Sequence, residues 1–167
     1  QSIWDWFFTI VLQEVPPQAD VLEVGTGRGD MWHENQHHIP HDWHITLTDF
    51  SAGMLEDNKA YLGDLSKRMT YNIVDVQDIP CSDKSFDVVF ANMMLYHVPD
   101  RPKAIAELRR VLKPDGVLFA MTNGENHMRE ISQIAYQLEE ITQWDSVFRD
   151  TFSLQNGEAQ LRQQFAD

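Results

Sequence analysis

The chain has 167 residues, of which 43% are hydrophobic and 23% charged, and 13 basic against 26 acidic side chains give a formal net charge of −13. This composition fits one globular domain with a real hydrophobic core. The acidic surface disfavours nucleic acid, since proteins that bind phosphate backbones carry basic patches, and favours a small, neutral or cationic partner. No apolar run approaches the ~20 residues that span a bilayer. The single cysteine, Cys81, excludes an internal disulfide and suits a reducing cytoplasm.

The N-terminal stretch IWDWFFTIVL predicts a helix with an aromatic face. Asp5 interrupts the stretch, and no basic leader precedes it, so a signal peptide is disfavoured. Its four aromatic residues, Trp4, Trp6, Phe7 and Phe8, are expected to pack in the core. A lid over a ligand is the alternative for them.

After this helix, short apolar runs typical of strands alternate with segments in which apolar residues recur at helical spacing. We predict strands at 21–24, 43–48, 69–74, 86–91 and 117–121. We predict helices at 29–38, at 51–66 with Ser51 as N-cap, at 104–112, at 128–141, and at 152–167 with a cap near Asn156. Pro114, Asp115 and Gly116 should form the turn before the fifth strand.

This alternation predicts the α/β class, with a doubly wound, mostly parallel sheet and helices on both faces. We expect a single domain over residues 1–167. It would comprise an N-terminal helix (1–17), a core (18–125) and C-terminal helices (126–167). Met93, Met94, Met121 and Met128 are expected to be core residues.

The turn VGTGRGD follows the first strand, at the edge of the sheet where open parallel sheets bind ligands. Gly25 and Gly27 permit positive φ angles and close approach of a ligand to the backbone. The spacing departs from the dinucleotide pattern G-x-G-x-x-G, and Glu23 would repel a pyrophosphate. A ligand that lacks phosphate and carries an ammonium or sulfonium group fits better. A tight turn without a ligand is the alternative.

Polar residues also end the next three strands. Asp49 lies about 20 residues past Gly27, where an acid can accept hydrogen bonds from both hydroxyls of a ribose, although it could simply cap the next helix. Asp75 could accept from an adenine amino group while Val76 packs on the ring. Asn92 ends the fourth strand in the same register.

Four stretches, VLEVGTGRGD, LTDFSAGML, NIVDVQDIPCSDKSFDVVFANMMLYHVPD and AIAELRRVLKPDGVLFAMTNG, together resemble the class I S-adenosylmethionine-dependent methyltransferases of the UbiE-like, small-molecule branch. The resemblance covers roughly residues 18–125. It implies a Rossmann-like sheet, S-adenosylmethionine as cofactor and methyl transfer to a small-molecule acceptor. By this resemblance the methionine-side loop is Glu23, Gly25, Thr26 and Gly27, the ribose is held by Asp49, the adenine is contacted by Phe50, Asp75 and Val76, and Asn92 lies beside the methionine part.

In the family the sheet carries two further strands, paired as a hairpin, beyond the fifth. We therefore expect this chain to be a fragment that lacks the last two strands. Such a fragment would expose a strand edge, which proteins normally cover. A second copy of the chain could cover it, so a homodimer is an open expectation.

Residues 33–37, HENQH, match the His-Glu-x-x-His pattern of zinc peptidases. On a helix, His33 and His37 would share a face. Catalytic zinc needs a third protein ligand, however, and no later segment offers an obvious one. We predict no functional metal site, and expect at most adventitious binding by the histidines between positions 33 and 44.

The acceptor side of the site carries weaker signals. His97 and Tyr96 follow the fourth strand and are candidates for a general base and a pocket wall, although packing against the next helix explains His97 equally well. Neither is assigned a catalytic role.

Two other functions stay open. The second choice after a methyltransferase is a catalytically silent module that binds S-adenosylmethionine, and the third is an NAD-dependent oxidoreductase.

Overall fold

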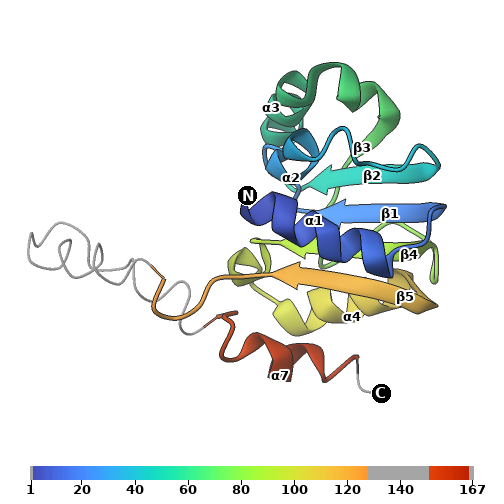
Figure 1. Cartoon of the computed structure of the whole chain (residues 1–167). Helices are drawn as coiled ribbons and strands as arrows, with labels where there is room; N and C mark the ends of the chain where they lie inside the picture. The colour runs from blue at the N-terminus through green and yellow to red at the C-terminus, as the bar shows by residue number, and fades with distance from the viewer. Residues whose placement is uncertain (1, 128–150, 166–167) are drawn as a thin grey trace, which may run out of the picture.

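The computed structural model describes residues 2–127 and 151–165. Its centre is a five-stranded sheet in the order β3-β2-β1-β4-β5 (Figure 1). The strands are β1 (Ala19–Val24), β2 (Trp43–Asp49), β3 (Met69–Ile73), β4 (Phe86–Asn92) and β5 (Leu112–Met121). All four pairings are parallel, in agreement with the predicted sheet. The chain changes direction across the sheet between β1 and β4, so a ligand crevice is expected at their carboxyl ends.

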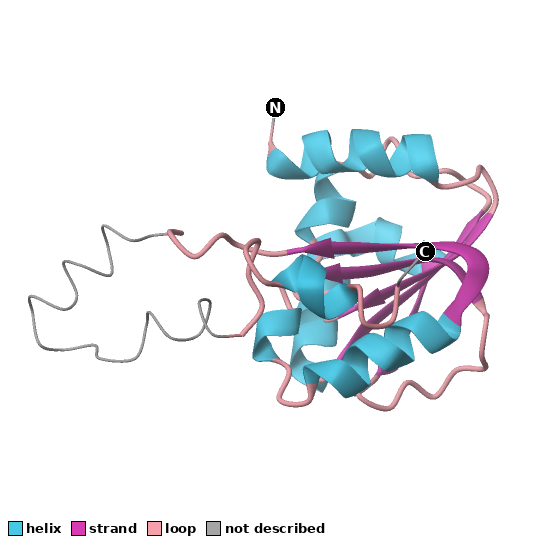
Figure 2. Cartoon of the chain, turned by 90° about the horizontal axis from the view of Figure 1, so that it is seen from below, coloured by secondary structure: helices cyan, strands magenta, loops and turns pink. Residues whose placement is uncertain are grey.

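Helices cover both faces of this sheet, which confirms the predicted layers (Figure 2). One face packs against α1 (Ile3–Glu14), α2 (Asp30–Glu34) and α3 (Ala52–Leu62), and the other against α4 (Arg101–Val111) and α7 (Gly157–Leu161). Two 3-10 helices, η1 (Gly63–Arg68) and η2 (Leu95–His97), complete the described elements. Within the described residues, no helix is long and apolar enough to cross a membrane.

Strand alternation decides which face each side chain joins. In β1, Val21 packs in the cluster on the α1 face, while Leu22 and Val24 pack in the cluster on the α4 face. In β4, Val88 and Val89 divide in the same way and are both fully buried, as predicted for a strand covered on both sides. By the same alternation, Glu23 is a carboxyl directed into the helix-covered interior.

The N-terminal helix is part of the core. Ser2 caps α1 through a reciprocal capping box with Asp5. Phe7 and Phe8 are buried beneath the helix, which confirms core packing for these two residues, whereas Trp6 is 53% exposed.

Several element boundaries differ from the predictions. The helix expected over 29–38 spans only Asp30–Glu34, because Asn35 ends it. The Asn35 backbone N–H and side-chain Nδ2 both donate to the Met31 carbonyl, at 3.3 and 2.9 Å. Ser51 does cap α3, accepting from the Met54 N–H, but α3 ends at Leu62 and a 3-10 turn follows.

The fifth strand begins earlier than expected. It starts at Leu112, and the segment Pro114–Gly116 forms an irregularity within the strand opposite Phe86–Val88 instead of a turn before it. The C-terminal helix predicted over 152–167 is confined to Gly157–Leu161, preceded by Asn156 at the N-cap. The helix predicted over 128–141, with Met128, lies outside the described residues.

Candidate functional site

The glycine turn after β1 is shaped by left-handed backbone. Gly25, Gly27 and Gly29 have φ angles of +63°, +54° and +89°, which favour glycine. A Cβ atom on Gly25 would lie 2.8 Å from the Cβ of Met94, so this position also requires the absence of a side chain. Two hydrogen bonds hold the turn against β2: the Thr26 N–H donates to the Thr48 carbonyl at 2.9 Å, and the Gly27 N–H to Asp49 Oδ2 at 3.1 Å. The turn is therefore anchored to the end of β2.

A broad cavity of about 560 Å³ opens beside this turn, at the carboxyl ends of the strands. Its lining is mainly apolar with a few polar groups, which is typical of ligand sites. The predicted site residues that line it are Gly25, Gly27, Asp49, Phe50, Asp75, Val76 and His97.

A narrower cavity of about 180 Å³ adjoins the broad one, and the two share Gly25, Gly27 and Met93. It is lined by the remaining predicted residues, Glu23, Thr26 and Asn92. The nine residues predicted to bind the cofactor therefore gather along two adjoining cavities. The carboxylates of β1, β2 and the segment after β3 lie at one edge of the sheet.

The carboxyl of Glu23 is the most perturbed group of this site. It is 3% exposed and accepts three hydrogen bonds: from Thr26 Oγ1 at 2.7 Å and Trp32 Nε1 at 2.5 Å on Oε2, and from Asn92 Nδ2 at 3.2 Å on Oε1. Burial raises the pKa of Glu23 from its usual 4.5 to about 7, although the three hydrogen bonds oppose this rise. The carboxyl therefore changes its protonation state near neutral pH.

The amide of Asn92 is buried beside this carboxyl, with 7% of the residue exposed. Its Nδ2 donates to Glu23, but its Oδ1 has no hydrogen-bond partner among the described residues. A buried acceptor without a donor costs free energy. Asn92, which lines the narrow cavity, thus carries a buried oxygen that could accept from a ligand N–H group.

The acids of the broad cavity are more accessible. Asp49 Oδ1 accepts from the Ser51 N–H at 2.9 Å, but Asp49 is not the N-cap that its alternative interpretation required, because Ser51 caps α3. Hydrogen bonds from the side chain and backbone of Gln77 lower the pKa of Asp75 and keep it ionised. Phe50, at 76% exposed, stands at the rim of the cavity.

The rings of the two candidate acceptor residues, Tyr96 and His97, are in contact, with centroids 4.4 Å apart, but only one of them lines the broad cavity. His97 is exposed and lines the broad cavity, whereas Tyr96 packs against the hydrophobic cluster on the α4 face, where burial raises the pKa of its phenol. Met93 and Met94 were expected in the core but are partly exposed and line the broad cavity. Met121 is partly buried against the core.

Two residues near the site were missed by the sequence analysis, Trp32, which donates to Glu23 from α2, and Gln77. Trp4 of α1, for which a lid over a ligand was the alternative to core packing, lines the narrow cavity. Gln77 holds Asp75. An acid followed two residues later by an amide was a usable signal for Gln77. No local signal marks Trp32, since it meets Glu23 only after α2 folds back on β1.

The zinc pattern does not form a site. His37 lies beyond the end of α2, so it does not share a helix face with His33, whose ring stacks on Tyr61 with centroids 4.3 Å apart. Over residues 2–127 and 151–165, no three His, Cys, Asp or Glu side chains lie close enough together to hold a metal ion.

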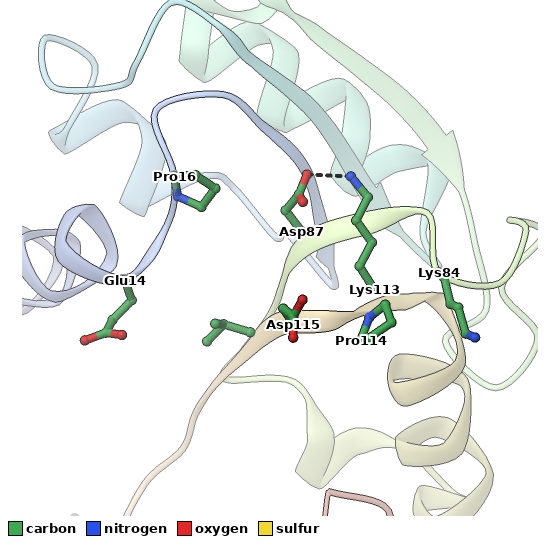
Figure 3. A pocket seen from close by; sticks show the side chains of 8 residues that line it. Glu14, Pro16, Lys84, Asp87, Lys113, Pro114 and Asp115 are labelled. Carbon is green, nitrogen blue, oxygen red and sulfur yellow. Dashed lines mark hydrogen bonds and ion pairs between the residues drawn. The ribbon is translucent and has the colours of Figure 1, made fainter.

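A different cavity, of about 400 Å³, lies at the amino ends of β4 and β5 (Figure 3). Lys113 donates there to Asp87 at 2.8 Å and to Asp20 at 3.0 Å. These ion pairs tie together β1, β4 and β5. Because none of the predicted site residues lies among those that line it, we regard this cluster as structural.

The fold is that of a Rossmann-like α/β domain with cavities at the carboxyl ends of its strands. Residues 22–120 match the family described as "Methyltransferase domain", and the chain belongs to this family.

Similarity to individual proteins supports the assignment to this family. The chain is 32% identical over 111 residues to the ubiquinone/menaquinone biosynthesis C-methyltransferase UbiE of Geotalea daltonii, covering 65% of this chain and 47% of the relative. It is 32% identical over 110 residues to the highly reducing polyketide synthase ctvA of Aspergillus terreus, covering 63% of this chain and 4% of the synthase. The chain therefore spans about half, or far less, of the curated relatives it matches.

Among solved structures, a SAM-dependent methyltransferase from Methanosarcina mazei superposes with a TM-score of 0.63 at 21% identity. The match covers 77% of this chain and 64% of that protein. At this identity the likeness establishes the shared α/β fold.

Proposed function

We propose that this domain transfers the methyl group of S-adenosylmethionine to a small-molecule acceptor. The observation that carries the proposal is the gathering of Glu23, Asp49 and Asp75 along two adjoining cavities at the carboxyl edge of the sheet. The name of the Geotalea relative, a C-methyltransferase, supports a carbon atom as the acceptor.

The residues present fit this cofactor. In the broad cavity, Asp49 would accept from the two ribose hydroxyls and Asp75 from the adenine amino group, while Phe50 and Val76 would contact the ring. In the narrow cavity, the carboxyl of Glu23 and the Oδ1 of Asn92, which has no partner in the part of the chain that the structure describes, suit the α-ammonium group of the methionine part. Gly25, Thr26 and Gly27 would lie along the cofactor where it passes from one cavity to the other.

When bound, S-adenosylmethionine supplies an activated methyl group with a good leaving group. The contribution of the chain is then to orient the two reactants and exclude water from the cleft. If the acceptor carries a proton at the point of attack, a base is needed. His97 is the candidate, because it is an exposed imidazole on the wall of the broad cavity.

Calorimetric titration with S-adenosylhomocysteine and with NAD tests the cofactor. We expect wild-type protein to bind the first and not the second, and Asp49→Ala to weaken binding by at least ten-fold, because two charge-assisted hydrogen bonds are lost. Preference for NAD would replace the proposal with an oxidoreductase.

Transfer of labelled methyl groups onto small-molecule extracts tests the reaction. Labelled product supports the proposed methyltransferase. Tight cofactor binding with no transfer to any fraction would instead favour the silent binding module.

Two further expectations form part of the proposal. We place the domain in the cytoplasm, on the basis of its single thiol, Cys81. We also propose that it forms a homodimer along β5, which ends the strand order and whose residues 117–121 are partly exposed. A mass from light scattering equal to that of one chain would refute the dimer.

A further inference from the structure

The indole of Trp32 lies fully buried between three elements. Its ring packs edge-to-face with Phe8 of α1 and Phe90 of β4, with centroids 6.3 and 5.8 Å apart. Its Nε1 donates to Glu23 Oε2 at 2.5 Å. The two flanking rings fix the plane of the indole, so the direction of its N–H bond is also fixed.

We propose that Trp32 is a positioning residue for the cofactor, whose indole N–H favours the carboxylate form of Glu23 and holds it with Oε1 toward Asn92 and the narrow cavity. This inference rests on the proposed function, in which that cavity takes the amino acid end of S-adenosylmethionine. It adds a role for a residue that does not itself line either cavity.

The hydrogen bonds around the carboxyl support this role. Oε2 is occupied by Trp32 and Thr26, which leaves Oε1 as the oxygen directed to Asn92. An indole N–H can only donate, so it stabilises the carboxylate over the neutral acid. Loss of this donor would leave Oε2 with Thr26 alone and raise the pKa of Glu23 further, because burial already disfavours the charge.

Other charged groups near Glu23 do not replace the indole. Asp49, on β2, is negative and raises the pKa of Glu23. Arg28 and Asp30 line the narrow cavity but pair with each other at 2.6 Å. His97 lines only the broad cavity. A ligand ammonium would therefore be the positive charge that the carboxylate lacks.

The test is calorimetric titration of S-adenosylhomocysteine between about pH 6 and about pH 8.5 with wild type and Trp32→Phe, which retains a ring between Phe8 and Phe90. Wild-type affinity should rise with pH and level off above about 7, where Glu23 is ionised. In the variant, the plateau should move up by about one pH unit. Affinity would then be about five-fold weaker at pH 7 and close to wild type at about pH 8.5.

A matched control is Trp43→Phe. Trp43 is also buried, and its Nε1 donates to the Pro16 carbonyl at 2.9 Å, away from Glu23. It should leave the pH profile unchanged. A second control uses 5′-methylthioadenosine, which lacks the amino acid part, and its affinity should not depend on Trp32 or on ionisation of Glu23.

The outcomes separate the two proposals. Failure of wild-type protein to bind S-adenosylhomocysteine at any pH overturns the proposed function. Binding by wild type, with a Trp32→Phe defect of equal size at pH 7 and about pH 8.5, overturns only the role of Trp32. If Trp32→Phe does not fold, Thr26→Val removes the other donor to Oε2. A profile in that variant without an upward shift would then refute the inference.

Discussion

Substitution of Glu23 by glutamine should stabilise the fold while weakening the binding of S-adenosylhomocysteine. The carboxyl is buried, and burial raises its pKa from 4.5 to about 7. Glutamine has nearly the same shape, carries no charge, and keeps one oxygen to accept from Thr26 and Trp32. Its amide nitrogen takes the place of Oε1 opposite Asn92 Nδ2, so the Asn92 amide has to turn over and accept through Oδ1. Glu23→Gln therefore removes a buried charge at the cost of rearranging one hydrogen bond.

The size of the effect follows from linkage. Because the folded-state pKa of Glu23 exceeds its unfolded-state value, the unfolded chain loses this proton first, and stability falls as pH rises from about 4.5 to about 7. A rise of this size, at ~1.4 kcal/mol per pH unit, corresponds to about 3 kcal/mol. The Glu23→Gln variant has no carboxyl at this position, so its stability should not fall in this way as pH rises. Its advantage in free energy of unfolding should be under ~1 kcal/mol at pH 5 and about 3 kcal/mol at pH 8.

Urea unfolding of both proteins at pH 5 and pH 8 measures this difference. Glu107→Gln is the control of opposite sign, because hydrogen bonds from Arg110 lower the pKa of Glu107 and its neutralisation should destabilise the fold. S-adenosylhomocysteine should bind Glu23→Gln at least ten-fold more weakly than wild type, as a carboxylate–ammonium contact is lost. The reasoning would be refuted by a stability difference that does not change with pH, or by a variant less stable than wild type at pH 8.

Three further outcomes are expected. Gly29→Ala should lower the free energy of unfolding by about 2 kcal/mol, because its φ is +89° and a Cβ would lie 2.7 Å from Asn58 Nδ2. Gly27→Ala, with a positive φ but nothing within 4 Å of a Cβ, should cost about 1 kcal/mol, and equal losses in urea unfolding would contradict this explanation. His37→Ala should leave methyl transfer unchanged with and without a zinc chelator, since His37 lies outside α2; loss of transfer would restore the zinc interpretation. Asp75→Asn should weaken binding of both S-adenosylhomocysteine and 5′-methylthioadenosine, by about three- to ten-fold in calorimetry, and an effect on the first ligand alone would place Asp75 away from the adenine.

The parts of the fold that can be predicted correctly from the sequence depend on local patterns. Short apolar runs bounded by glycine or polar residues predict the five strands to within a few residues at most ends. Since parallel strands share one carboxyl edge, the polar residues that follow them have to meet there. This explains why the amino-acid sequence alone is enough to group Glu23, Asp49 and Asp75.

The predictions that were wrong concern features that depend on specific side-chain contacts, strand pairing or backbone conformation. The early end of α2 coincides with Asn35, which leaves the helical conformation at the C-cap while its side chain donates to the Met31 carbonyl. The early start of β5 at Leu112 results from its pairing with Phe86. Hydrophobicity alone places Met93 in the core. It instead adopts a left-handed φ of +55° directly after β4, which directs the chain along the cleft.

The buried carboxyl of Glu23 lowers the stability of the fold when it is ionised, and the same charge suits it to bind a cation. Its donors from Trp32, Thr26 and Asn92 favour the carboxylate, whereas burial opposes it, and the balance leaves its pKa near 7. More donors would have held the charge permanently, and fewer would have left a neutral acid with little attraction for an ammonium group. In the present arrangement, a bound ammonium would shift Glu23 fully to its ionised form and satisfy Asn92 Oδ1 in the same step. The free energy that these two buried groups cost the fold would thus be regained when a cationic amine binds, which favours such ligands over neutral nucleosides of the same shape.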